Sequence, residues 1–233
     1  MHDLPLFIKL TEAKVNDKVL LDYVTLPPGS ILVFDRAYRK YEMWASYTER
    51  GITWVTREIG DEYYETDKEI EISQECSENG IITDELITLG KGINKGTILK
   101  ARRIYYKDTI SGKELVFLTN NVLLTASQIA DIYKRRWQIE VFFKRLKRHN
   151  PLRYFLGDNE NAIKIQIWSA LIADLLVQII KDKLTRKWAF TNLSSIIKHH
   201  LMNYIDLFKF LNNPEEKLVI SNDHDDIQLK LKL

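Results

Sequence analysis

Residues 125–149 read TASQIADIYKRRWQIEVFFKRLKRH and decide the fold of the chain. Thr125 and Gln128 have the spacing of a capping box, in which each side chain binds a backbone N–H at the start of a helix. Pro151 disfavours helical geometry at Asn150, and no glycine or proline interrupts the stretch before it. The stretch therefore predicts one uninterrupted helix of about six turns.

At roughly 100° per residue, the side chains of this helix form three stripes. An apolar stripe, which we expect to be buried, comprises Ile129, Ile132, Ile139, Phe143 and Leu146. A basic stripe on the far side comprises Lys134, Lys144, Arg145 and Arg148. The seam between them carries Tyr133, Arg136, Glu140 and Lys147. A carboxylate on a rigid helix, at the edge of a core and facing cations, is well placed to bind a metal ion beside a phosphate.

The spacing along this seam is Y-x2-R-x3-E-x6-K. Taken one at a time, its residues have ordinary structural explanations: Arg136 and Glu140 can form an i,i+4 salt bridge, Lys147 can be solvated and Tyr133 can be half-buried. Taken together, and within the words IYKRRWQIEVFFKRLK, they resemble the Tyr-Arg-Glu-Lys signature of the DDE transposases of the insertion sequence four family. The joint pattern favours the transposase interpretation.

A second candidate acid follows a continuous apolar run. Residues 30–34, SILVF, predict a central strand covered on both faces, and Asp35 lies at its carboxyl end, where ligands bind in open α/β sheets. An isolated aspartate more often caps the following helix, here residues 39–50. The word FDRAY, residues 34–38, resembles the second catalytic motif of the family, and this resemblance favours a catalytic Asp35. The next predicted strand, residues 51–57, also ends in a family-like Thr-Arg.

The fold class follows from the order of these elements. Residues 58–124 alternate between apolar and polar positions and contain glycine turns, a pattern typical of antiparallel hairpins. The resemblance implies an α/β, RNase H-like fold, incomplete at the N-terminus, with an all-β insertion and C-terminal helices. We expect a partial core over residues 1–57, the insertion over 58–124, a core completed by the catalytic helix and a buried helix over 125–184, and a helical region with a polar tail over 185–233.

The resemblance also implies a chemistry, namely metal-dependent DNA strand cleavage and strand transfer at the ends of an insertion sequence. Asp35 and Glu140 would be the catalytic acids and would bind two Mg²⁺ ions. The implied partners are double-stranded DNA, at terminal inverted repeats and target sites, and a second copy of the chain. The DNA contacts would come from the seam and the basic stripe: Tyr133, Arg136, Trp137, Lys147, Lys134, Arg145 and Arg148. Trp137 would support an extruded base, and a buried core tryptophan is the alternative.

Composition fits a folded protein of a reducing cytoplasm. The chain is 45% apolar, which suffices for a core, and its single cysteine, Cys76, excludes an internal disulfide. Residues 130–155 carry eight Lys and Arg against two acids, whereas residues 58–90 carry eleven acids against one lysine. The first segment suits a phosphate backbone and the second repels one. Residues 165–180 are apolar but contain Asp174 and are shorter than the roughly 20 residues of a membrane span, so we expect a core helix.

Two departures from the family qualify these expectations. The family has a first catalytic aspartate on an earlier strand, and here only Asp3, at a different place, matches it in residue type. Some relatives stack a flipped base on a tryptophan in the insertion, and residues 58–124 contain none. We therefore expect the carboxyl-terminal part of a transposase, inactive by itself. The alternative is a non-catalytic DNA-binding or dimerisation remnant that competes with full-length transposase. A host RNase H-like nuclease would leave the Tyr-Arg-Lys pattern without a role.

Overall fold

The computed structural model describes residues 8–11, 25–38, 40–60, 63–91, 95–150, 152, 154–203 and 205–215. The chain divides into two compact units. The first, Pro5–Val141, is called here the sheet unit, and the second, Phe142–Leu233 with Met1–Leu4, the helical unit. Asp3 lies outside the described residues.

One six-stranded sheet organises the sheet unit, with the order β1-β2-β6-β5-β4-β3. The strands are β1 Ile31–Val33, β2 Thr53–Arg57, β3 Tyr64–Glu69, β4 Ile81–Lys91, β5 Lys95–Lys107 and β6 Glu114–Thr119. Strands β1 and β2 are parallel, and every other neighbouring pair is antiparallel. The mixed α/β class is confirmed, and the sheet with its helices is compatible with an RNase H-like fold. The antiparallel strands that follow β2 continue its sheet, because β6 pairs directly with β2.

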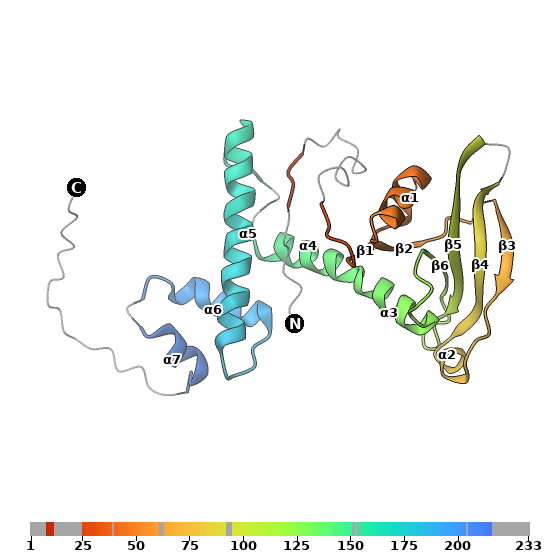
Figure 1. Cartoon of the computed structure of the whole chain (residues 1–233). Helices are drawn as coiled ribbons and strands as arrows, with labels where there is room; N and C mark the ends of the chain where they lie inside the picture. Colours follow the sequence, from red (N-terminus) through yellow and green to blue (C-terminus); the bar gives the residue numbers. More distant parts are fainter. Residues whose placement is uncertain are drawn as a thin grey trace, which may run out of the picture. The chain divides into compact units, whose positions relative to one another are not determined.

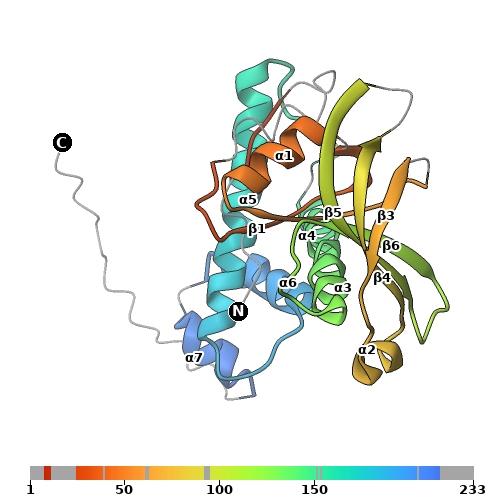
Figure 2. The ribbon, with the colours of Figure 1, turned by 45° about the vertical axis from the view of Figure 1, so that its right-hand side comes forward.

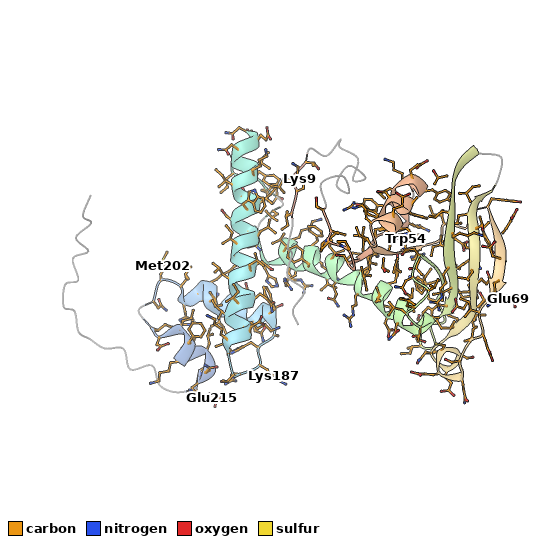
Figure 3. All side chains as sticks on the ribbon, viewed as in Figure 1. Lys9, Trp54, Glu69, Lys187, Met202 and Glu215 are labelled. Atoms are coloured by element: carbon orange, nitrogen blue, oxygen red, sulfur yellow. The ribbon has the colours of Figure 1, made fainter. Side chains whose placement is uncertain are left out.

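Helices cover both faces of the sheet where β2 runs. Helix α1, Tyr41–Glu49, lies on one face and α3, Ala126–Arg135, on the other (Figures 1 and 2). Successive residues of a strand point to opposite faces. Accordingly Trp54, labelled beneath α1 in Figure 3, stacks on Trp44 of α1 with 4.9 Å between ring centroids, while Val55 packs in the cluster that contains Ile129 of α3.

The beginning of α3 is built as the sequence predicts. Thr125 Oγ1 accepts the N–H of Gln128 at 3.2 Å, and Gln128 Oε1 accepts the N–H of Thr125 at 2.9 Å. A buried arginine holds the preceding loop in place. Arg102 donates to both carboxylate oxygens of Asp84, at 2.7 and 2.6 Å, and to the carbonyl oxygen of Leu124 at 2.6 Å. The short helix α2, Gln74–Glu78, packs near the same end of the sheet.

The predicted uninterrupted helix over residues 125–149 is wrong in one respect. It breaks at Arg136 into α3 and α4, Trp137–His149. The N–H of Arg136 bonds to the carbonyl of Tyr133 and the N–H of Ile139 to that of Arg136, which is the i→i−3 pattern of a tighter 3₁₀ turn. Because a tighter turn rotates the following residues, the apolar stripe does not continue into α4.

The buried positions of α4 agree with the prediction only in part. Leu146 is buried as predicted, but Ile139 and Phe143, expected in the core, are exposed, and Phe142, outside the predicted stripe, is buried. Phe142 and Leu146 are four residues apart and so share one face of α4. The end of the helix at His149, just before Asn150 and Pro151, agrees with the prediction.

The helical unit contains α5 Glu160–Lys183, α6 Phe190–His200 and α7 Leu207–Asn212. Leu193, Ile197 and Leu211 form its small core, and Trp188 Nε1 donates to the carbonyl of Leu211 at 2.8 Å.

Helix α5 packs inside the helical unit along one side only. Only Ala170, Leu171, Asp174 and Gln178 are buried along its 24 residues. Among the described helices it alone is long and apolar enough to cross a bilayer, a criterion of length and composition that core helices of soluble proteins also meet.

Candidate functional site

Asp35 lies at the carboxyl end of β1. The N–H of Phe34 still donates to the carbonyl of Val55 on β2, so Asp35 follows the last paired residue directly. Its Oδ1 accepts the N–H of Arg36 at 2.6 Å, and its carbonyl accepts the N–H of Tyr38 at 3.0 Å, which starts the one-turn 3₁₀ helix η2, Arg36–Tyr38. Asp35 does not cap α1, whose N-cap residue is Lys40. Its second carboxylate oxygen, Oδ2, lies at the rim of the sheet, 3.6 Å from Arg136 Nη1.

Arg136 brings the two candidate acids together. Its Nη2 lies 2.6 Å from Glu140 Oε1, and its Nη1 lies 3.6 Å from Asp35 Oδ2. The Asp35 and Glu140 side chains are 44% and 41% exposed, whereas the Arg136 side chain is only 19% exposed. Two solvent-accessible carboxylates thus share one guanidinium at the point where α3 gives way to α4.

Tyr133 forms the inner wall of this site. Its ring is buried and packs on Phe117 of β6, with 5.0 Å between centroids. Burial, with the nearby Asp35 carboxylate, raises the pKa of the phenol, and the cations of Arg136 and Arg57 oppose this shift. Among the described residues, neither the Tyr133 hydroxyl nor Arg136 Nε has a hydrogen-bond partner of standard geometry. Both donor atoms lie beside the carboxylates and are shielded from solvent.

Arg57 is a site residue that the sequence analysis did not select. The parallel register pairs Val33 with Val55, so Asp35 and Arg57, each two residues further on, occupy equivalent ends of neighbouring strands on the α3 face. Arg57 also pairs with Phe117, the residue on which Tyr133 packs. The Thr-Arg at the end of the predicted strand was the available signal, but its place beside Asp35 required the strand register.

The cationic candidate DNA contacts of α4, Arg145, Lys147 and Arg148, fall in the helical unit. Lys147 lies seven residues after Glu140 on the same helix. It lines an open hollow of about 990 Å³ together with Lys144, Arg148, His149, Asn150, Leu152 and Tyr154. Three cations and an exposed tyrosine give this hollow the character of a phosphate-binding surface.

Three further predicted contacts differ in their surroundings. Trp137 is 59% exposed, so it is not the buried core tryptophan of the alternative interpretation. Lys134 lies over the Tyr106 ring at 4.7 Å and 3.4 Å from Asp131, with about half of its side chain exposed. Arg145, predicted on the exposed basic stripe, instead binds both oxygens of the buried Asp174 at 3.1 and 2.7 Å. The prediction that Arg145 is exposed was wrong, because its partner Asp174 lies on another helix, α5, and the pattern of α4 alone does not indicate it.

The carboxylates can be tested for their fit to a metal ion. The described residues contain no group of three or more His, Cys, Asp or Glu side chains that could hold one. Mg²⁺ is commonly bound through one or two carboxylates together with water and substrate phosphates. Asp35 and Glu140, accessible and converging on one cation, fit that donor set in chemistry and number.

Comparison with known proteins identifies the family. Residues 1–176 match the family described as transposase DDE domain. The y4zB protein of Sinorhizobium fredii, whose name describes a transposase, is 31% identical over 178 residues, which cover 76% of this chain and 50% of that protein. A Geobacillus stearothermophilus protein named as a transposase for insertion sequence element IS5377 is 31% identical over 173 residues, or 71% of this chain and 43% of that protein. A Synechocystis protein named for element IS4SA is 49% identical over 53 residues, or 23% of this chain and 16% of that protein.

The chain belongs to the DDE transposase family. Members of this family generally use divalent metal ions and bind the ends of transposons. The chain spans about half the length of the first two curated relatives it matches.

Proposed function

We propose that this chain carries part of the active site of a transposase that cleaves and joins DNA strands at the ends of an insertion sequence, within an RNase H-like fold interrupted by residues 58–124. The observation that supports this proposal is the convergence of Asp35 and Glu140 on Arg136. Because the two acids are 105 positions apart in the sequence, no local helical pairing accounts for their meeting. A single Cys76 and a DNA substrate are consistent with action in the cytoplasm, at the nucleoid.

Asp35 and Glu140 would hold the divalent ions, with Mg²⁺ as the natural choice for an all-oxygen donor set. When bound, such ions activate the attacking hydroxyl or water and stabilise the leaving oxygen. The protein's own part is to place one acid on the rigid end of a sheet and the other on a helix. Two carboxylates are few for two ions, so we propose that cleavage requires a further acid beyond Asp35 and Glu140.

The remaining residues would position the DNA. The Tyr133 hydroxyl and the Arg136 guanidinium would donate to phosphate oxygens, since both have donors without protein partners. Arg57, at the neighbouring strand end, adds a positive charge to the same rim. The exposed Trp137 would stack on an extruded base, and Lys147, Lys134 and Arg148 would bind the backbone. Arg145 would contribute through its pairing with Asp174 rather than through a direct contact.

Nicking and metal binding test this proposal together. A labelled duplex that ends in a terminal inverted repeat is incubated with the chain and Mg²⁺ or Mn²⁺, with and without the amino-terminal part of a full-length relative. Metal-dependent nicking that Glu140→Gln abolishes supports the enzyme. Mn²⁺ binding, with or without DNA, that neither Asp35→Asn nor Glu140→Gln weakens contradicts the site.

A second candidate function is a non-catalytic DNA-binding protein that competes with full-length transposase. The cationic hollow around Lys147 favours it, because that surface needs no metal. End-binding without nicking under any of these conditions, unchanged by Glu140→Ala, would support this second function. The two candidate functions therefore differ in whether substitution of Glu140 abolishes a nicking activity.

A further inference from the structure

One glutamine of α5 binds the backbone of the segment that follows α4. Gln166 Nε2 donates to the carbonyl oxygen of Tyr154 at 2.8 Å, and Gln166 Oε1 accepts the N–H of Leu156 at 3.0 Å. A single side-chain amide therefore fixes the backbone on both sides of Phe155. These residues all belong to the helical unit, so their contacts do not depend on where the sheet unit lies.

The same segment is held against the beginning of α5 at two more points. Asn159 Oδ1 accepts the N–H of Ala162 at 2.8 Å and so caps the helix. Gly157 lies so close to α5 that a Cβ added to it would be 2.7 Å from the Cβ of Ala162. A larger residue at this position would push the segment away from the helix. The backbone that carries Tyr154 is therefore preorganised by contacts within the chain.

The Tyr154 side chain lines the cationic hollow together with three cations of α4. Lys144, Lys147 and Arg148 are three and four positions apart and so share one face of that helix. Within the described part of the chain, the Tyr154 ring pairs with no aromatic ring and no cation. Cations for the phosphates beside an aromatic face for the bases are the combination by which proteins bind single-stranded nucleic acid.

We propose that the hollow binds unpaired nucleotides of DNA, with a base stacked on the Tyr154 ring and the adjoining phosphates on the cations of α4. A base inside a duplex is stacked between its neighbours, so only an unpaired or terminal base can offer its face to this ring. Gln166 is a positioning residue, because a fixed Tyr154 backbone loses little freedom when the base binds. The proposal rests on the proposed function only in the choice of DNA as the nucleic acid.

Fluorescence anisotropy of the full chain with a labelled single strand, and with a blunt duplex of the same sequence, measures this preference. Tyr154→Ala is expected to weaken single-strand binding by at least about fivefold and duplex binding by less than about twofold. Tyr154→Phe keeps the ring and should bind as the wild type does. Tyr63→Ala removes an exposed tyrosine of the sheet unit and is the matched control. Single-strand binding that Tyr154→Ala does not weaken overturns the proposal, as does an equal loss of duplex binding.

Two further measurements separate stacking from charge. Because Tyr154→Ala removes no charge, the slope of log affinity against log salt should stay that of the wild type, whereas Lys147→Gln should reduce it by about 0.7. Strands that carry 5-iodouracil at successive positions, irradiated in the complex, should cross-link to Tyr154. Cross-links that form only at other residues overturn the proposal.

Gln166→Leu tests the positioning role, because it removes both hydrogen bonds to the segment. It should weaken single-strand binding without changing the salt slope, and adding Tyr154→Ala to it should cause little further loss. Fully additive losses overturn the positioning role. Mn²⁺ binding by Asp35 and Glu140 is measured on the same variants without DNA and should be unchanged. A failure of the stacking site therefore leaves the proposed transposase site untouched, and the reverse holds as well.

Discussion

Arg136 and Glu140 form a hydrogen-bonded ion pair of 2.6 Å, and the same guanidinium lies 3.6 Å from Asp35. A divalent ion that binds both carboxylates must compete with this guanidinium. Conversely, a DNA phosphate that attracts Arg136 releases the carboxylates for the metal. Because such coupling is reciprocal, metal binding and phosphate binding are expected to strengthen each other.

Arg136→Gln is therefore expected to tighten Mn²⁺ binding in the absence of DNA. Each partly exposed ion pair contributes about 0.2 to 1 kcal/mol, so the loss of two should raise the affinity by about 2- to 30-fold. Electron paramagnetic resonance of free Mn²⁺ measures this. Lys134→Gln removes a cation on the neighbouring turn whose carboxylate partner is Asp131, and it should have no effect. Unchanged Mn²⁺ affinity in Arg136→Gln would show that the guanidinium does not compete.

Asp35→Asn and Glu140→Gln should each weaken Mn²⁺ binding by at least about tenfold, because each removes a charged oxygen ligand. Both side chains are more than two-fifths exposed, so the cost in folding stability should stay within about 0.5 kcal/mol. Isothermal calorimetry and thermal unfolding measure the two effects. Glu160→Gln, an exposed acid paired with Lys164, is the matched control. Equal metal affinity in all three variants would exclude Asp35 and Glu140 as the ligands.

Local signals in the sequence were sufficient to predict the start of α3 and the end of α4. The capping box of Thr125 and Gln128 depends on residues three positions apart. The apolar run before Asp35 predicts the strand β1, but among the described strands β1 lies at the edge of the sheet with Ile31 47% exposed, and not at its centre as predicted. The meeting of Asp35 with Arg136 could be expected only from the resemblance. No periodicity relates a strand end to a helix about a hundred residues later.

Features that depend on partners far away in the sequence were not predicted, because no local pattern relates such positions. Arg145 looks like a solvated cation on the helix, and its partner Asp174 is 29 positions away. The interruption of the helix at Arg136 could not be predicted either, because residues 125–149 contain no glycine or proline.

Asp174→Asn and Arg145→Ala test the link between α4 and α5. The Asp174 side chain is fully buried and the Arg145 side chain is 23% exposed. Removing Arg145 leaves a buried carboxylate without its cation, which should destabilise the protein by about 3 kcal/mol. Urea unfolding measures the loss.

The double variant Arg145→Met with Asp174→Leu should recover most of that stability, because neither residue is then left charged and unpaired. Lys144→Ala, which changes the exposed neighbour of Arg145, should change stability by less than about 0.5 kcal/mol. If Arg145→Ala is as mild as Lys144→Ala, the pair does not hold the two helices together. DNA binding by the double variant then shows whether Arg145 contacts the phosphates directly.

His149 is expected to make stability fall on the acid side of neutrality. Burial, then the cations Lys198 and Arg148, lower its pKa below the ordinary value of 6.5. Below pH 6.5 the unfolded chain takes up this proton before the folded chain does. The free energy of unfolding therefore decreases as the pH falls from 6.5 through the folded pKa. His149→Gln should flatten this part of the pH profile, whereas His199→Gln, at an exposed position, should not. Proton NMR of the imidazole, recorded with urea unfolding between pH 4.5 and 7.5, measures both quantities. An imidazole that titrates at or above 6.5 would mean that the surrounding cations do not act on it. The hollow that His149 lines with Lys147 would then be less positive than its residues indicate.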